Sequence, residues 1–436
     1  MAVRTTNLPT TNRGVLALAD RRLDALAISA LALFTILSRI PYIPADHMGY
    51  DGPLYINALK LDSTYSVPQP GNIGYVLLGK FVSLLVAKPH LAFAIVGIAI
   101  CTLAIPFIYL LSTLLFRRSL AFAIALCCAT SVSSWYHSVV IQSYIVWLFA
   151  LPAIAYFGLR FIRERDTRLH ICAATTLGLS TILRPDLVMF GGPLLAAILL
   201  LGRARLHHWL IAGLIGALCC CFWFFFTASI HGGPARYIQL VRNQNEYINT
   251  FGLEGRGILE GVLRNTVKYL QFLLWAVHLA LFPAAIGALL ILKNLRTQWR
   301  TAFLALAWVG PSLYFSIILF MGNAGLILPA LPLVYLAAAH ACTTLIPRRA
   351  TAILLALTAI NIAQFTLTPL PRMTDQRRVL LTHMFFGYSG QGLRRMYNLQ
   401  LDDYGVGRSL KDTVHQFMHP DPLPKVPDRL PADLRP

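Results

Sequence analysis

A long series of apolar runs constrains the fold of this chain more than any other feature. Such runs recur from Leu23 to Pro369, and each is close to the roughly 20 residues that a helix needs to cross a bilayer core. One run of this kind can be a cleaved signal peptide, but a long series cannot. The first run follows Arg21 and Arg22 and lacks a small-residue cleavage site, so we expect it to be retained. The pattern predicts an all-α membrane protein.

Composition agrees with this class. Charged residues make up 13% of the chain, about half the roughly 25% of a soluble domain. The formal net charge of +19 would indicate nucleic-acid binding in a soluble protein. Here the Lys and Arg residues fall in breaks between apolar runs, so we expect no nucleic-acid partner. The cysteines lie within apolar runs without CxxC spacing, and we expect neither disulfides nor a cysteine metal site.

The runs predict about eleven transmembrane helices. Arginine clusters occur at every second boundary between them, which places these boundaries in the cytoplasm. The resulting domains are a cytoplasmic N-terminus over 1–22, a transmembrane module over 23–370 and an extracytoplasmic tail over 371–436. The helices are predicted at 23–41, 90–115, 119–136, 139–161, 169–184, 186–201, 209–230, 269–292, 302–320, 324–346 and 351–369.

The segment 73–87 is apolar but shorter than a membrane span, and it contains Lys80. If it crossed the membrane, every later arginine cluster would move to the outside. We therefore expect an interfacial helix on the outer surface. The outer loops 42–89 and 231–268 are then long, as is the tail. Because polar residues gather on one side, we expect a site there.

Asp51 is the leading candidate for chemistry in the first outer loop. Gly52 and Pro53 follow it, and Pro53 suits the first turn of a helix that carries Leu54, Ala58 and Leu61 on one face. The helix dipole would favour an ionised carboxylate at this position. An ordinary helix-start aspartate is the alternative interpretation. Rigid turns at Pro68, Pro70 and Gly71 favour a loop that holds the carboxylate over the membrane.

Several stretches resemble the GT-C superfamily of polyprenyl-phosphate-sugar-dependent glycosyltransferases. These are the Asp-containing first loop with its YINALK-type helix and GYVLLGKF segment, ILRPDLVMFGGPL at 182–194, and GNAGLILPALPLVYLAAA at 322–339. The likeness covers about 20–345 and is greatest to bacterial relatives of protein O-mannosyltransferases and aminoarabinose transferases. The chain departs from the family's frequent His-Pro-Pro-Gly-Tyr motif at 68–72.

The resemblance implies an inverting sugar transfer. An aspartate of the first loop acts as general base or hydrogen-bond acceptor for an acceptor hydroxyl, which displaces polyprenyl phosphate from the sugar. By motif match this residue is Asp51. Asp46 is its nearest rival. His47 either assists one of them or, as is more common, is an ordinary loop histidine. No cofactor is certain, and a divalent cation shared by the two carboxylates stays open.

The departing phosphate needs a cationic partner. Arg184 is the best internal candidate because Arg-Pro-Asp interrupts the apolar stretch 169–201; an Arg184–Asp186 pair that stabilises the turn is the equally weighted alternative. Tyr136 and His137 are candidates for the sugar pocket. The weaker phosphate candidates are Lys60, Arg236, Arg242 and Arg256.

The sequence shows no DxD-like signature and no Walker loop, which disfavours a nucleotide donor. The leading hypothesis is therefore a glycosyltransferase of the bacterial inner membrane, with its active site on the extracytoplasmic face and a cell-envelope glycolipid, polysaccharide or protein as acceptor. A lipid or solute transporter or flippase is the alternative, because a buried Arg184 would also suit transport. A non-enzymatic scaffold is a third hypothesis.

Overall fold

A computed structural model describes residues 10–43, 52–60, 71–251 and 257–367 of the chain. Over these ranges the regular structure is helical and contains no strand. The helices are α1 (Thr10–Arg39), α2 (Gly52–Ala58), α3 (Ile73–Ser83), α4 (Pro89–Thr113), α5 (Arg118–Thr130), α6 (Val132–Val139), α7 (Ile145–Glu164), α8 (Thr167–Leu183), α9 (Leu187–Leu201), α10 (Leu206–Ile230), α11 (Pro234–Phe251), α12 (Ile258–Val277), α13 (Leu281–Lys293), α14 (Leu295–Leu313), α15 (Leu331–Leu345) and α16 (Ala350–Leu367), with short turns η1 (Ile40–Tyr42), η2 (His278–Ala280), η3 (Tyr314–Leu319) and η4 (Ala324–Ile327).

Six helical stretches in this part of the chain are long and apolar enough to cross a membrane, and α5 with α6 forms a seventh if the bent pair is one span. The prediction of an α-helical, multi-pass membrane protein is thereby confirmed. The count of eleven crossings stays a prediction, because several of the predicted runs fall on shorter apolar helices. The six stretches are Asp20–Tyr42, Pro89–Thr113, Ile145–Glu164, Leu206–Ile230, Ile258–Lys293 and Leu295–Leu319.

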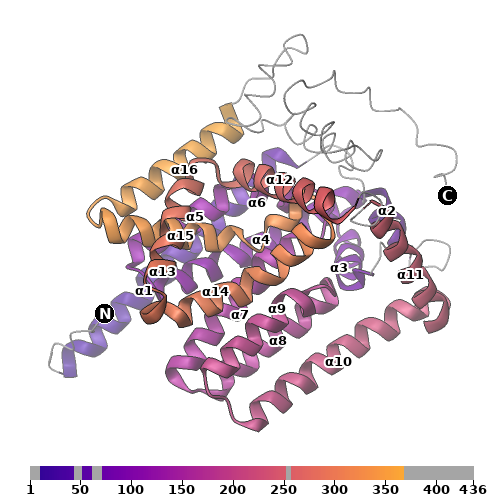
Figure 1. The fold of residues 1–436 in the computed structure, drawn as a ribbon, viewed down its shortest axis with the longest axis horizontal. Coiled ribbons are helices and arrows are strands. Elements are labelled where there is room, and N and C mark those ends of the chain that lie inside the picture. The colour runs from indigo at the N-terminus through magenta and orange to yellow at the C-terminus, as the bar shows by residue number, and fades with distance from the viewer. Residues whose placement is uncertain (1–9, 44–51, 61–70, 252–256, 368–436) are drawn as a thin grey trace.

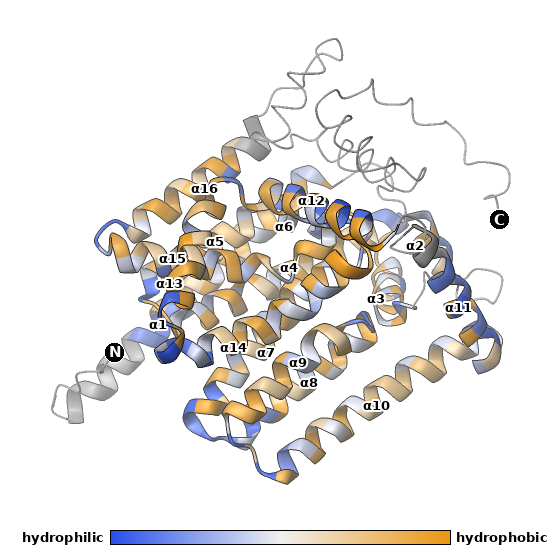
Figure 2. Cartoon of the chain, in the orientation of Figure 1, coloured by the Kyte–Doolittle hydropathy of each residue, from blue (hydrophilic) through white to orange (hydrophobic). Residues whose placement is uncertain are grey.

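Helices α4, α5, α7 and α15 pack against one another inside the bundle, and Figure 1 shows α10 at its outer edge. Only 6% of the residues in the apolar part of α10 are buried, against 67% in that of α7. Apolar colour runs along whole helices in Figure 2, and the hydrophilic colour gathers at their ends and on α11. An outer helix that stays apolar on its exposed side is what a lipid-facing helix requires.

Two predicted helices contain breaks that the apolar pattern does not signal. The run at 119–136 bends by 56° between α5 and α6, where Ser131 takes an extended conformation. The run at 269–292 is interrupted at His278, which has a φ of 46°. The two breaks meet, since the Ser131 hydroxyl donates a hydrogen bond of 2.8 Å to the carbonyl of Ala276. This bond satisfies a carbonyl that lies next to the second break.

A buried guanidinium supports the first break. Arg39, at the end of α1, donates to the carbonyl of Ala129 in the last turn of α5 and to the Ser138 hydroxyl of α6 over 3.3 Å. Its Cζ lies 5.0 Å from the ring centroid of Trp135. A cation at the carbonyl end of α5 complements the helix dipole. The bend thus has hydrogen-bond partners on both sides.

Several breaks that the sequence predicts to be cytoplasmic lie together. Arg118 forms ion pairs with Asp20 over 2.9 Å and with Asp24 over 2.7 Å. Arg163 donates to the carbonyl of Leu114 over 2.9 Å. These contacts join the first half of α1 to the α4–α5 break and the end of α7. The side of the membrane on which they lie remains a prediction.

The segment 73–87 forms α3, a helix of 11 residues. At about 1.5 Å per residue it is roughly 17 Å long, too short to cross a core of about 30 Å. A side chain at Gly74 would meet the carbonyl of Ile182 at 2.7 Å, so α3 packs closely on α8. Its predicted place on the outer interface is not tested by these contacts.

Candidate functional site

An ion pair between buried Arg184 and partly buried Asp186 lies where α8 ends. Pro185 follows Arg184 and cannot continue the helix, and Arg184 itself is extended with φ −152° and ψ 101°. Its Nε donates to both carboxylate oxygens of Asp186 over 3.0 Å, and its Nη2 donates to Oδ2 over 2.9 Å. Such a two-pronged contact is the strong form of an arginine–carboxylate pair. The turn-stabilising pair weighed from the sequence is therefore present.

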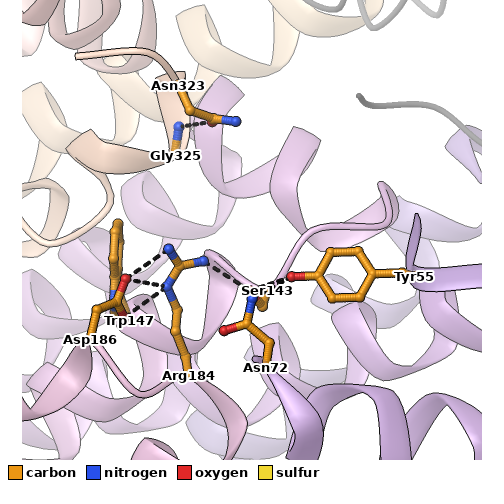
Figure 3. A network of polar contacts seen from close by, with 8 residues as sticks. All are labelled: Tyr55, Asn72, Ser143, Trp147, Arg184, Asp186, Asn323 and Gly325. Carbon is orange, nitrogen blue, oxygen red and sulfur yellow. Dashed lines mark hydrogen bonds and ion pairs between the residues drawn. The ribbon is translucent and has the colours of Figure 1, made fainter. Parts of the chain in front are cut away.

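Two aromatic rings enclose this guanidinium. The Cζ of Arg184 lies 3.9 Å from the ring centroid of Tyr144 and 4.1 Å from that of Trp147. The indole N–H of Trp147 also donates to Asp186 Oδ1 over 3.1 Å. Ring faces attract a guanidinium electrostatically, more strongly where water is excluded. Trp147 in the first turn of α7 thus contacts both members of the ion pair (Figure 3), and Tyr144 just before α7 contacts Arg184.

The other edge of Arg184 connects to the first predicted outer loop. Its Nη1 donates to the Ser143 hydroxyl over 2.8 Å, and that hydroxyl shares a hydrogen bond of 3.2 Å with the Tyr55 hydroxyl. The Asn72 amide donates to Tyr55 over 2.5 Å. Figure 3 shows this chain from Asp186 to Tyr55. Tyr55 belongs to α2, which begins directly after Asp51, so α2 is fixed to two distant helix ends.

Aromatic rings of α3 and α4 pack against Tyr55 of α2. The ring of Tyr55 lies 5.2 Å from that of Tyr75 in α3 and 5.9 Å from that of Phe93 in α4. Burial raises the pKa of the Tyr75 phenol well above its usual range, which keeps it protonated and uncharged. Edge-to-face packing of this kind adds rigidity beyond area burial alone. Helix α2 is therefore packed closely against α3 beside the ion pair.

A glycine turn covers the ring that lies on Arg184. The Asn323 side chain accepts a hydrogen bond of 2.7 Å from the Gly325 amide at the start of η4. A Cβ at Gly325 would clash with the ring of Tyr144, so only glycine permits this approach. This is the segment GNAGLI, and Figure 3 shows it above the ion pair.

A buried cationic face on α12 lies nearby in the fold. Arg264 and Lys268 are one helical turn apart, 6% and 5% exposed. Asn265 lies between them and donates to the carbonyl of Ile317 in η3 over 3.2 Å. The same helix contacts α6 and η4. Because cationic side chains bind phosphate oxygens, this face is a second candidate for an anion.

The predicted site residues divide into two groups. Asp46, Asp51 and Arg256 lie outside the described residues, as does the tail over 371–436. Arg184, Tyr136 and His137 are buried, while Lys60 is exposed in the turn after α2. The structure brings His137 close to Arg184 through Tyr144, whose ring centroid lies 5.8 Å from that of His137. The assignment of roles to these residues stays a prediction.

Sequence reasoning missed several residues of this region. The spacing of Arg264 and Lys268 in an amphipathic stretch is visible in the sequence, but the run was expected to begin at 269. Gln142 is the sole amide side chain between 119 and 161, which is also a visible signal. Over the described ranges, no three His, Cys, Asp or Glu side chains come together to hold a metal ion. The missed residues are Tyr55, Asn72, Gln142, Ser143, Tyr144, Arg264 and Lys268.

Comparisons with known proteins identify no family. No family model matches the chain, and no curated protein matches it. Among solved structures, the chain is similar to the crystal structure of the Archaeoglobus fulgidus oligosaccharyltransferase in its apo form, with 14% sequence identity and a TM-score of 0.49. The match covers 92% of this chain and 58% of that one. At this level the likeness assigns neither a family nor an activity.

Proposed function

We propose that this chain is an inverting membrane glycosyltransferase that moves a sugar from a polyprenyl-phosphate donor to a hydroxyl acceptor outside the cytoplasmic membrane of a bacterium. The acceptor is a component of the cell envelope. The sequence resemblance supports the reaction class, and one structural observation supports the location of the active site beside α2. A buried hydrogen-bonded chain from Asp186 through Arg184 and Ser143 to Tyr55 fixes α2, which directly follows Asp51.

The proposed reaction needs one carboxylate and one anion-binding group. The acceptor oxygen attacks the anomeric carbon, the bond from that carbon to the phosphate oxygen breaks, and its electron pair leaves with the polyprenyl phosphate. The hydroxyl proton passes to Asp51 as general base. An aspartate has a low intrinsic pKa, so orientation of the acceptor and attraction to the cationic transition state make up much of its contribution.

Cationic groups for the phosphate are available in the described structure. Arginine has five N–H donors, and Asp186 and Ser143 occupy three of those of Arg184. The remaining edge of Arg184 is one candidate contact. The α12 pair Arg264 and Lys268 is another, since it adds two positive charges on the face turned toward η3. Phosphate oxygens bind such groups strongly where water is excluded.

Transport is a second candidate function, and the meeting of two helix breaks favours it. Interrupted membrane helices line the substrate sites of many transporters, and here the break at Ser131 contacts the turn before the break at His278. A transporter requires a site that is reached alternately from both sides. It would move its lipid without changing it chemically, whereas a transferase consumes the sugar-linked lipid and releases polyprenyl phosphate.

The test is the substitution Asp51→Asn in purified full-length protein, with polyprenyl-phosphate-linked hexoses as donors and a cell-envelope extract as acceptor. We expect release of polyprenyl phosphate by the unaltered protein and a loss of at least about 100-fold in turnover by the variant. Asp46→Asn is the matched control and should keep most of the activity.

Two results would contradict this proposal. Full turnover by Asp51→Asn with loss in Asp46→Asn would move the base to Asp46. Movement of intact sugar-linked lipid between the two leaflets of proteoliposomes, with no polyprenyl phosphate released, would replace the transferase with the transporter.

A further inference from the structure

A buried polar stretch on α6 and the turn after it contains hydrogen-bonding groups that the fold leaves unused. His137 is 0% exposed and Gln142 is 1% exposed. Neither the ring nitrogens of His137 nor the amide atoms of Gln142 have a hydrogen-bond partner outside this pair among the described residues, and the two side chains interact with each other. The Ser133 hydroxyl of α6 is likewise buried without a hydrogen-bond partner among the described residues. Buried polar atoms in native proteins are almost always bonded, so this concentration needs a reason.

The two side chains lie next to each other and close to the ion pair. Gln142 directly precedes Ser143, which accepts from Arg184. The His137 ring packs edge-on against Tyr136, with ring centroids 4.9 Å apart. The unused groups therefore belong to the same buried region as the Tyr55–Arg184 chain. His137 lies in α6, and Gln142 lies in the interruption between α6 and α7.

We propose that His137 and Gln142 form a hydroxyl-binding subsite that recognises the transferred sugar. This inference depends on the proposed glycosyl transfer and adds the groups that read the donor. An imidazole offers one donor and one acceptor, and a carboxamide offers two donors and an acceptor oxygen. Adjacent sugar hydroxyls, each both donor and acceptor, satisfy this set. The neighbouring tyrosine rings provide apolar faces for the C–H side of a sugar ring.

Stability offers a readout that separates this role from a structural one. A polar group that is bonded within the fold destabilises the protein when it is removed, because its partner loses a hydrogen bond. A group kept for a ligand does not, because its replacement by an apolar side chain removes a desolvation cost. The ligand-free variants Gln142→Leu and His137→Phe should therefore unfold at the same temperature as the unaltered protein or at a higher one.

Binding is measured on full-length protein in detergent with polyprenyl phosphate and with polyprenyl-phosphate-linked mannose, glucose and galactose. We expect the unaltered protein to bind at least one sugar-linked lipid about tenfold more tightly than the bare lipid. Gln142→Leu and His137→Phe should lose that preference and keep their affinity for the bare lipid. The half-buried residues Gln298 and His340 provide the matched controls Gln298→Leu and His340→Phe, which should keep the preference.

The subsite is wrong if both variants keep the sugar preference of the unaltered protein, since other groups would then recognise the sugar. It is also wrong if both variants unfold at clearly lower temperature. Gln142→Met, which keeps the length of the side chain, repeats the test if Gln142→Leu does not fold. Absence of sugar transfer by the unaltered protein would instead overturn the proposed function, so the two failures are distinguishable.

Discussion

Arg184 shows how a single residue can hold a charge among apolar helices. Its guanidinium lies between the rings of Tyr144 and Trp147 and bonds Asp186 along one edge. From the sequence, Arg-Pro-Asp within an apolar stretch marks this position, because charged groups there must be paired or functional. The ring contacts depend on residues some forty positions earlier, and no local pattern could indicate them. A functional or paired charge at Arg184 was thus predictable from the sequence, but its contacts with the rings of Tyr144 and Trp147 were not.

The substitution Arg184→Met should lower the free energy of unfolding by about 2 kcal/mol, because it leaves the partly buried Asp186 without its cationic partner. The double variant Arg184→Met/Asp186→Leu should recover much of that loss. Arg160→Met, at a surface pair with Glu164 over 2.7 Å, is the control and should cost under about 1 kcal/mol. Denaturant unfolding in detergent measures all three. Equal losses at Arg184 and Arg160 would contradict the enclosed pair.

At the scale of elements, interruptions of helices determine where the candidate site lies. The α6–α7 turn, the α8–α9 turn and η4 contribute Ser143, Arg184 and Gly325 to one region. Apolar periodicity predicts helices well, since each of them must bury or expose one stripe. It does not predict a break such as that at Ser131, because both neighbouring segments remain apolar. Tertiary hydrogen bonds, rather than composition, fix that bend.

Close helix packing predicts opposite effects for two glycines. A Cβ at Gly287 of α13 would clash with the backbone carbonyl of Ala337 in α15, whereas a Cβ at Gly213 of α10 meets nothing within 4 Å. Gly287→Ala should therefore destabilise the protein by about 1–3 kcal/mol through overpacking. Gly213→Ala should stabilise it by up to about 1 kcal/mol through helix propensity. Thermal unfolding in detergent measures both shifts, and a neutral Gly287→Ala would contradict the close contact.

At the scale of the whole molecule, the sequence predicts a membrane protein with its basic breaks on one side. The helices are confirmed, and the contacts of Arg118 with Asp20 and Asp24 bring two of these breaks together. The candidate base Asp51 and the tail over 371–436 lie outside the described residues, so their roles rest on sequence and chemistry. The buried residues of the candidate site come from elements that are far apart in the sequence. For this reason only three of them, Arg184, Tyr136 and His137, were predicted.

The orientation of the chain can be tested at the two ends of α10. This helix has 25 residues, about 37 Å at 1.5 Å per residue, so its ends lie on opposite sides of a membrane core of about 30 Å. Cysteines introduced as Arg205→Cys and Ala235→Cys replace exposed residues just outside either end. In whole cells, an impermeant maleimide should label Ala235→Cys and not Arg205→Cys, with the unsubstituted protein as background. The opposite labelling would mean that the number of membrane crossings before α10 differs by one from the predicted number, or that the whole chain is inverted, and it would contradict the predicted orientation.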